Sequence, residues 1–410
     1  MPTDLDDAKE RLCAEVDRRA ERLVEASHDI WEHPELNFEE HHAHDVLTAI
    51  LEDEGVEVER SAYDVATAFA ARAGSEGPTV AVLCEYDALP EIGHACGHNV
   101  IGTAGLGAGL AAAALADTLG GRVVILGTPA EEGGGGKVYL AERGALDDVD
   151  VAMMVHPAGH DLVRMDVIAI HQLHIDYRGE AAHAAAFPHK GRNALDAAVL
   201  GYNAVAALRQ HILPGERIHG IFTHAGDKPN IVPSYAQAHW YVRSPTLRSL
   251  EALKPRVVAC LEAGAAAAAC SCEIRWDDPA YADMLDNGPV GTAYLANAAR
   301  TGRHLIDPAA AGSPVVGSTD MGNVSYVVPA IHPMIAVAPP EISIHTPEFA
   351  TYARGEAGDR AVVDGAKALA MTIADLWLDP DLLAAARTAH AEDLARAGGT
   401  DGVPGADRRD

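Results

Sequence analysis

The densest group of side chains that could do chemistry lies in EYDALPEIGHACGHN, residues 85–99. Cys96 and His98 stand on either side of one glycine, so both can face a single ion if the chain bends there. Thiolate and imidazole are ligands typical of zinc and other transition metals. Taken alone, this short pattern is equally compatible with a free thiol beside hydrogen-bonded histidines.

A second group lies in GTPAEEGGGGK, residues 127–137, where Glu131 and Glu132 follow an apolar segment. Adjacent carboxylates repel each other unless a cation is nearby. One of them could bind a cation while the other handles a proton, and a solvated acidic turn is the alternative. A nucleotide-binding P-loop is excluded, because that motif needs Gly where Glu131 stands and Ser or Thr where Val138 stands.

Two histidines follow further apolar segments. His156 comes directly after VDVAMMV (149–155), and His345 lies just past MIAVAP (334–339). Several sheet segments therefore end in side chains that can bind metal, which chance explains poorly. Together the candidate ligands suit two cations that share a bridging ligand and a water, rather than one tetrahedral structural zinc. They are Cys96, His98, Glu132, His156 and His345.

The apolar segments that precede these residues predict a parallel sheet. Residues 78–84, 121–128 and 149–155 are short runs rich in β-branched side chains, and a helical stretch separates the first two. Helical periodicity also marks residues 5–27 and 39–54. This order predicts an α/β domain whose site lies at the carboxyl ends of its strands.

A second domain interrupts the first. Residues 168–283 follow the order β-α-β-β-α-β, which predicts a ferredoxin-like insertion, and the α/β pattern resumes afterwards. The expected fold class is thus α/β, with a mixed, largely parallel sheet, helices on both faces and an inserted domain. The expected division is a catalytic domain in two parts, an inserted domain and a disordered polar tail: 1–167 with 284–390, 168–283, and 391–410.

The composition narrows the classes of partner. The 410 residues include 31 Lys and Arg against 60 Asp and Glu, a formal net charge of −29. Such a surface repels phosphate backbones and anionic lipid, so neither nucleic acid nor a membrane is expected as a partner. The apolar stretch 100–116 is shorter than a membrane span and is expected to be a buried helix. Six cysteines without framework spacing, and no signal-peptide pattern, predict a cytoplasmic protein.

The order and spacing of these motifs resemble metallopeptidase family 20 along most of the chain. Within it, the wording of GTPAEEGGGGK and STDMGNVS is similar to the amidohydrolase branch, in the subgroup of aminobenzoyl-glutamate hydrolases and aminoacylase-like dipeptidases. Further matching segments are WEHPELNFEE (31–40), GEAAHAAAFPHKGRNALDA (179–197), KPNIVP (228–233) and HTPEF (345–349).

The resemblance implies a role for each matching residue. The five candidate ligands would hold two divalent ions, and Glu131 would act as general base and later as general acid. His183 would reach the active site of a partner subunit and stabilise the oxyanion or the substrate, and Asn230 would line the substrate cleft. The inserted domain would be a lid or dimerisation domain, which implies a homodimer or a higher homo-oligomer.

The sequence departs from other branches of the family at one point. Those branches use a His-x-Asp pair and a bridging Asp, where this chain has Glu85-Tyr86-Asp87 and Cys96. Asp87 is expected to orient a ligand from behind the metal. The thiolate disfavours magnesium and calcium, so zinc or manganese is expected, with cobalt or nickel as alternatives.

The predicted function is hydrolysis of the amide bond in small N-acyl amino acids, aminobenzoyl-glutamate-like compounds or dipeptides by a metal-activated water. One alternative is a metallo-carboxypeptidase or aminopeptidase that acts on longer peptides. Another is a non-catalytic metal-binding scaffold of the same fold. A nucleotide-binding protein is disfavoured, because GLGAGLAAA does not complete G-x-G-x-x-G.

Overall fold

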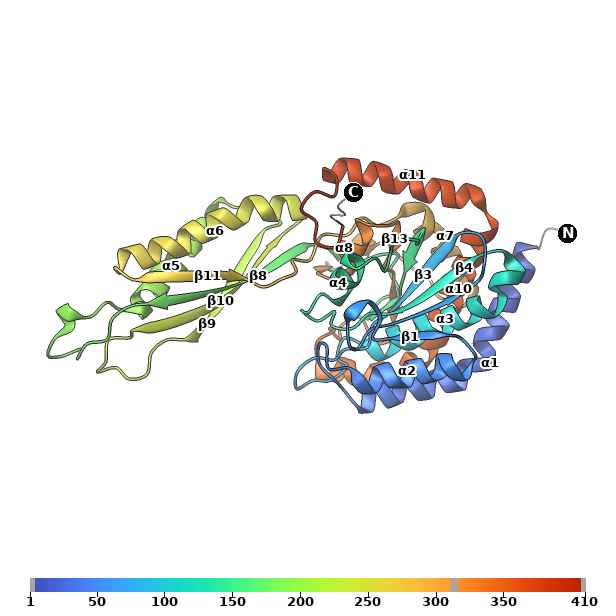
Figure 1. Cartoon of the computed structure of the whole chain (residues 1–410), viewed down its shortest axis with the longest axis horizontal. Helices are drawn as coiled ribbons and strands as arrows, with labels where there is room; N and C mark the ends of the chain where they lie inside the picture. The colour runs from blue at the N-terminus through green and yellow to red at the C-terminus, as the bar shows by residue number, and fades with distance from the viewer. Residues whose placement is uncertain (1–3, 311–315, 407–410) are drawn as a thin grey trace. The chain divides into compact units, whose positions relative to one another are not determined.

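The computed structural model describes residues 4–310 and 316–406 and divides the chain into two compact units (Figure 1). The first unit combines Met1–Asp166 with Met284–Asp410, and the second is Val167–Asp283. The second unit differs by one residue from the insertion expected at 168–283.

In its described residues, the first unit contains a six-stranded mixed sheet with the strand order β1-β2-β4-β3-β5-β13. Strands β4, β3, β5 and β13 are parallel, and β1 and β2 run antiparallel at one edge. Short strands form two further pairs, β6 with β14 and β7 with β12. The strands are β1 Val58–Arg60, β2 Phe69–Ala73, β3 Thr79–Cys84, β4 Arg122–Gly127, β5 Val151–Met153, β6 His156–Ala158, β7 Asp166–Val167, β12 Val316–Gly317, β13 Ala330–Ile331 and β14 Met334–Ala336.

Helices cover both faces of this sheet. Val80 and Val82 of β3 pack on one side, in the core that α1, α3 and α10 share, and Ala81 and Leu83 pack on the other, with α4 and α8. This arrangement confirms the predicted α/β class. The helices are α1 Leu5–Glu32, α2 His41–Asp53, α3 His98–Leu119, α4 Gly136–Glu142, α7 Gly288–Arg300, α8 Met321–Ser325, α9 Pro347–Ala353, α10 Glu356–Leu378 and α11 Pro380–Ala397.

Helix α3 lies directly on the sheet because it carries glycines on its inner face. A Cβ at Gly105 would stand 2.8 Å from the Cys84 sulfur, and one at Gly109 would stand 2.4 Å from Ile125 Cγ1. Among the described residues, α3 is the helix long and apolar enough to cross a membrane. Its most apolar stretch is 83% buried within the unit, as in the core helix of a folded domain.

The second unit, all of whose residues are described, has a four-stranded antiparallel sheet in the order β11-β8-β10-β9. This is the strand order that a β-α-β-β-α-β chain gives in a ferredoxin-like fold. Alternate residues of β10 are buried, which leaves the opposite face of the sheet partly exposed. The elements are β8 Ala169–Arg178, α5 Ala194–Leu208, β9 Arg217–His224, β10 Tyr235–Ser244, α6 Leu247–Ala267 and β11 Ser271–Trp276.

The expectation of a disordered tail at 391–410 is wrong for the described residues up to 406. Helix α11 runs on to Ala397, because Asp379 caps its first turn and Pro380 opens it. After the helix, Val403 and Ala406 are buried, and the Asn323 side-chain amide donates to the Pro404 carbonyl at 2.9 Å. Residues 407–410 lie outside the described part of the chain.

Candidate metal centre

The bend between Cys96 and His98 depends on Gly97. Its φ is 81°, a left-handed conformation that glycine adopts without strain. A Cβ at this position would stand 2.9 Å from two carbon atoms of the Pro157 ring. Only glycine therefore fits here, and the bend buries both the Cys96 and the His98 side chains at the start of α3.

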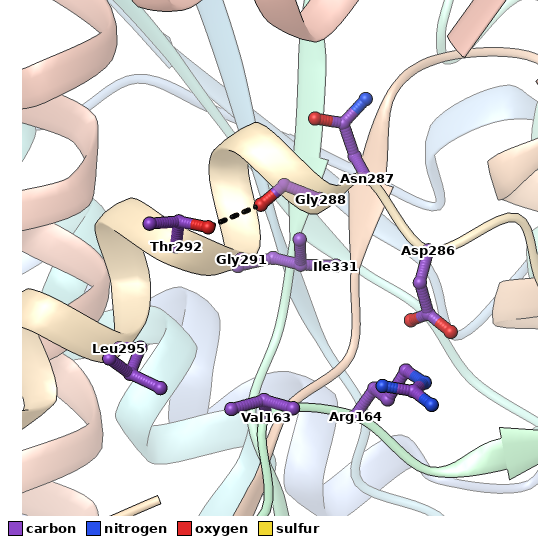
Figure 2. Close-up of a pocket in the computed structure, with 9 residues that line it drawn as sticks. All are labelled: Val163, Arg164, Asp286, Asn287, Gly288, Gly291, Thr292, Leu295 and Ile331. Carbon is purple, nitrogen blue, oxygen red and sulfur yellow. Dashed lines mark hydrogen bonds between the residues drawn. The ribbon is translucent and has the colours of Figure 1, made fainter. Parts of the chain in front are cut away.

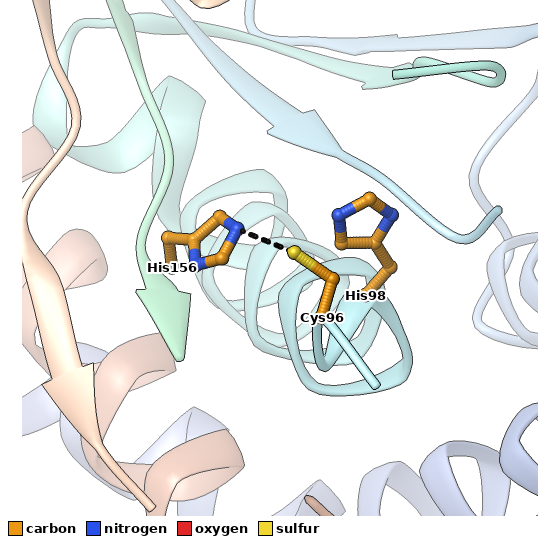
Figure 3. A group of neighbouring side chains, drawn as sticks. All are labelled: Cys96, His98 and His156. Atoms are coloured by element: carbon orange, nitrogen blue, oxygen red, sulfur yellow. Dashed lines mark hydrogen bonds between the residues drawn. The ribbon is translucent and has the colours of Figure 1, made fainter. Parts of the chain in front are cut away.

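A first group of donor atoms joins Cys96 and His98 to His156 (Figure 3). These atoms all lie within 4.8 Å of one another, and Cys96 Sγ is 3.4 Å from His156 Nε2. The other ring nitrogen of His156, Nδ1, donates to the Pro157 carbonyl at 2.7 Å. That bond leaves the lone pair of Nε2 directed at the thiol, as a metal ligand requires.

A second group joins the same Cys96 to Glu132 and His345, again with all donor atoms within 4.8 Å. His345 Nε2 lies 3.4 Å from Glu132 Oε1. The backbone N–H of His345 donates to the Ala95 carbonyl at 2.8 Å, which ties the segment after β14 to the loop before α3. The His345 side chain is 49% exposed, so this half of the centre is open to solvent.

Glu131 and Asp87 complete the surroundings of His98. The Nε2 atom of His98 is 3.9 Å from Glu131 Oε2 and 3.8 Å from Glu132 Oε1. On the other side of the ring, Nδ1 donates to Asp87 Oδ1 at 2.8 Å, and the Glu132 N–H donates to Asp87 Oδ2 at 2.9 Å. Asp87 therefore orients His98 and Glu132 together, the arrangement expected of a residue behind the ligands.

The donor atoms have the separations that a bound divalent ion requires. With metal–ligand bonds of about 2.0–2.3 Å in a tetrahedral site, two ligand atoms stand about 3.4 Å apart. The two pairs named above, thiol with imidazole and imidazole with carboxylate, are both 3.4 Å apart. His98 Nε2 and Glu132 Oε1 are also buried without a hydrogen-bond partner. The residues present therefore fit a pair of divalent ions that share Cys96.

The charge of the centre also fits cations. Glu85, Asp87, Glu131 and Asp320 are all buried, and together they outnumber the ammonium group of Lys137 beside them. Burial raises the pKa of Asp320 to about 6, against the opposing charge of Lys137. Burial and the nearby charges of Glu85 and Glu132 raise the pKa of Glu131. Buried negative charge of this density is costly unless cations compensate it.

The pKa shifts of the ligands differ in direction. Burial and the neighbouring His332 and His98 rings lower the pKa of His156, which keeps its imidazole neutral for metal binding. Burial and Glu132 raise the pKa of the Cys96 thiol, so its deprotonation requires a bound cation. Burial opposes the charged form of His98, but the charges of Asp87 and Cys96 outweigh it and raise the pKa of His98.

Glu40 was not among the residues expected from the sequence to matter, yet it supports Glu131. Its carboxylate accepts the Ala130 N–H at 2.8 Å and the Thr67 hydroxyl at 2.8 Å. Ala130 has a φ of 59°, a strained conformation that this bond holds just before Glu131. Glu40 stands at the start of a helical pattern with no chemical motif around it, so no local signal distinguished it.

His183 and Asn230 lie in the second unit, apart in sequence from every metal donor of the first. They are neighbours, because the Ala184 N–H donates to the Asn230 carbonyl at 3.0 Å. His183 is exposed, and its Nδ1 accepts the N–H groups of Ala185 and Ala186 at 3.3 and 3.1 Å. These bonds leave Nε2 to carry the proton, which the ring presents as a donor.

A separate cavity of about 390 Å³ lies elsewhere in the first unit (Figure 2). It contains one charged pair of residue types, Arg164 and Asp286, and burial raises the pKa of Asp286 to about 7. None of the metal donors lines it, so metal-dependent chemistry does not take place in it. Its lining is Val163, Arg164, Asp286, Asn287, Gly288, Gly291, Thr292, Leu295 and Ile331.

Known proteins resemble this chain over most of its length. The profile of peptidase family M20/M25/M40 matches residues 81–375. A mouse (Mus musculus) Xaa-Arg dipeptidase is 40% identical over 393 residues, which cover 92% of this chain and 91% of that protein. A p-aminobenzoyl-glutamate hydrolase chain of Escherichia coli (strain K12) is 30% identical over 454 residues, covering 92% and 93%.

Two solved structures share the fold. A dinuclear metal-binding peptidase of the M20 family from Bacillus subtilis has a TM-score of 0.67 at 19% identity, covering 88% of this chain and 99% of that one. An aminobenzoyl-glutamate utilization protein from Klebsiella pneumoniae has a TM-score of 0.69 at 20% identity, covering 90% and 98%.

Proposed function

The chain belongs to peptidase family M20/M25/M40, and on this basis we propose that it cleaves small N-acyl amino acids or dipeptides at a centre of two divalent ions. The family membership confirms the predicted family and the predicted enzyme class, a hydrolase of amide or peptide bonds. The observation that carries the proposal is the pair of donor groups that share Cys96.

The residues around the centre divide the work of hydrolysis. Divalent ions held there would supply Lewis acidity, which polarises a carbonyl group and makes water more acidic. Glu131 accepts a proton from the water whose oxygen attacks the carbonyl carbon, and delivers it to the amide nitrogen as the C–N bond breaks. Its raised pKa suits both steps, because the carboxyl group then holds a proton nearer to neutral pH. A proton carrier of this kind typically contributes ~10²–10⁴-fold to the rate.

The identity of the ions follows from the ligand types. Cys96 is a soft ligand and the histidines are intermediate ones, which favours zinc or manganese, with cobalt or nickel as alternatives. Asp87, which bonds both His98 and Glu132, would fix the direction of these ligands. We place the protein in the cytoplasm, because all six of its cysteines lie in described residues and are free.

His183 and Asn230 would act on the substrate from the second unit. The exposed Nε2–H of His183 is a donor able to stabilise an oxyanion, and Asn230 lies beside it. We propose that the chain forms a homodimer through this unit. Strand β9 supports this, because it is an edge strand of the sheet that carries the exposed apolar side chains of Ile221 and Phe222.

The substrate class is tested with a defined panel of compounds. The enzyme, reconstituted separately with zinc and with manganese, would be incubated with Xaa-Arg dipeptides, p-aminobenzoyl-glutamate, N-acetyl amino acids and pentapeptides. Mass spectrometry then identifies the products. We expect one new amine and one new carboxylic acid from a dipeptide or an N-acyl amino acid, and no release from the pentapeptides.

The matched control is Glu131→Gln, which keeps the size of the side chain and removes its ability to carry the proton. It should bind metal as the wild type does and lose at least about 100-fold in kcat. Cleavage confined to the pentapeptides would instead support the alternative of a carboxypeptidase or aminopeptidase.

A further inference from the structure

Glu85 lies at the same sheet edge as the metal donors but belongs to neither donor group described above. It directly follows β3 and is fully buried. Its Oε2 atom stands 3.5 Å from His98 Nε2, and both of these atoms lack a hydrogen-bond partner. Because His98 Nδ1 donates to Asp87, Nε2 faces Glu85 with its lone pair when the ring is neutral. A lone pair facing a carboxylate oxygen in a buried site is unfavourable unless a cation lies between them.

The distance itself is that of two ligands on one ion. The separation of 3.5 Å between Glu85 Oε2 and His98 Nε2 is close to the 3.4 Å of the thiol–imidazole and imidazole–carboxylate pairs. It is also close to the separation of about 3.4 Å that tetrahedral coordination sets for nitrogen and oxygen ligands. Glu85 therefore satisfies the same geometric test as the ligands already named.

Lys137 holds the Glu85 carboxylate in place. The Lys137 ammonium is 2.6 Å from Glu85 Oε1 and 2.7 Å from Asp320 Oδ1. The backbone N–H of Lys137 also donates to Asp320 Oδ2, at 3.0 Å. Lys137 thus occupies one oxygen of Glu85 and leaves the other directed at His98.

The charges show that Lys137 does not account for Glu85. Lys137 and Asp320 already form a neutral buried pair, with both side chains at most 1% exposed. Glu85 adds a negative charge to this pair, and an unbalanced buried charge costs several kcal/mol. A divalent ion beside His98 would balance it.

We infer that Glu85 is a further ligand of the ion held by Cys96, His98 and His156, and that Lys137 and Asp320 position it. This inference rests on the proposed dinuclear centre. It makes the two metal positions unequal. The ion beside Glu85 has four protein ligands, as closed structural sites do, whereas the ion at Cys96, Glu132 and His345 has three and keeps a position for water or substrate. The half-exposed His345 belongs to this open position.

The test measures metal binding directly. The metal-free protein would be titrated with zinc against a chromophoric chelator, and separately with cobalt, whose absorption spectrum reports the number and type of ligands. We expect two zinc ions with distinct affinities in the wild type. Glu85→Gln should weaken the tighter of the two at least about tenfold, leave the weaker one unchanged and alter the cobalt spectrum.

Two further variants separate the loss of a ligand from a loss of folding. Glu85→Asp keeps the charge beside Lys137 but withdraws the oxygen by one methylene, so it should weaken the same ion and still fold. Asp375→Asn is the matched control, because Asp375 pairs with the buried Lys9 at 2.6 Å away from the centre. It should leave both zinc affinities unchanged.

Wild-type affinities for both ions in Glu85→Gln and Glu85→Asp would overturn the role of Glu85 and leave the dinuclear centre standing. A wild-type chain that binds fewer than two zinc ions would overturn the dinuclear centre, and this assignment with it.

Discussion

Hydrogen bonds to the backbone and to Asp87 determine which nitrogen each buried histidine offers to a metal. His156 gives its Nδ1 proton to the Pro157 carbonyl, and His98 gives its own to Asp87. In both rings the free atom is therefore Nε2, and both free atoms lie near Cys96. The centre is built in advance of metal binding, which lowers the cost of ordering its ligands.

Asp286 provides a test of pH dependence at a single residue away from the centre. Its pKa rises from 3.8 to about 7 because the folded chain buries it. Between about pH 4 and pH 7 the unfolded chain has this carboxyl ionised while the folded chain keeps it protonated. The free energy of unfolding therefore falls as the pH rises through this interval.

Asp286→Asn removes this dependence. Urea unfolding of the metal-free variant and wild type at pH 5 and pH 8 should show the variant gaining about 1 kcal/mol or more over the wild type at the higher pH. Arg164 keeps its ion pair with Asp307 at 3.0 Å in either protein. An equal difference at both pH values would refute the burial of this charge.

The sequence contained enough to name the donors, since each is a metal-type side chain in a short motif. It did not contain enough to name the residues that hold them. In the sequence, Lys137 bears only on the exclusion of a P-loop, and its partners Glu85 and Asp320 are 52 and 183 positions away. Glu40 and Ala130, 90 positions apart, meet only in the folded chain. A single sequence carries no sign of pairings over such distances.

Helix α3 is the element that brings the sheet and the centre together. Its first residue is His98, and its glycines allow the close contact with β3 and β4 that fixes the position of that residue. A methyl group at Gly109 would overlap Ile125, with its Cβ 2.4 Å from Cγ1.

A pair of glycine-to-alanine variants tests this packing. Gly109→Ala should lower the free energy of unfolding by about 1–3 kcal/mol, because the added methyl group must displace α3 or Ile125. Gly291→Ala, in α7, has nothing within 4 Å of its new Cβ and should raise it by up to about 1 kcal/mol through helix propensity. Denaturant unfolding measures both. A neutral Gly109→Ala would mean that α3 does not rest directly on the sheet.

Elements were predicted well where one pattern dominated. The buried strands β3 and β4 are continuous β-branched runs, and the helices with clear periodicity lie close to their expected bounds. Helix α1 continues to Glu32, beyond the expected end at 27, because the Trp31 indole donates to the Ala350 carbonyl at 2.7 Å. Helix α11 was missed, because the glycines that follow it dominated the appearance of the tail. Both differences arise from contacts with segments distant in the sequence.

At the scale of the whole molecule, the second unit has the surface expected of an interface between copies. Strand β9 is at the sheet edge, and its Ile221 is 65% exposed. Leu200 of α5 is 42% exposed and Tyr202 is 36% exposed. Exposed apolar side chains beside an unpaired strand edge favour pairing with a second chain.

Light scattering after size exclusion tests the proposed dimer. The wild type should have twice the mass of the 43.0 kDa chain, and Ile221→Lys combined with Leu200→Glu should have the mass of one chain. Leu36→Glu changes an equally exposed apolar residue of the first unit, 44% exposed, and should leave the dimer intact. If His183 acts on the partner's site, the monomeric variant keeps its metal and loses its activity. A wild-type mass of one chain would contradict the dimer.

The central claim is that two ions share Cys96 while Glu131 remains available to carry the proton. The most direct measurement is the anomalous scattering of zinc in crystals of the Glu131→Gln variant with a bound dipeptide. The account predicts two zinc positions, each about 2.3 Å from Cys96 Sγ, and no bond from the side chain of residue 131 to either. A single zinc position, or two positions of which neither is bonded to Cys96, would contradict it.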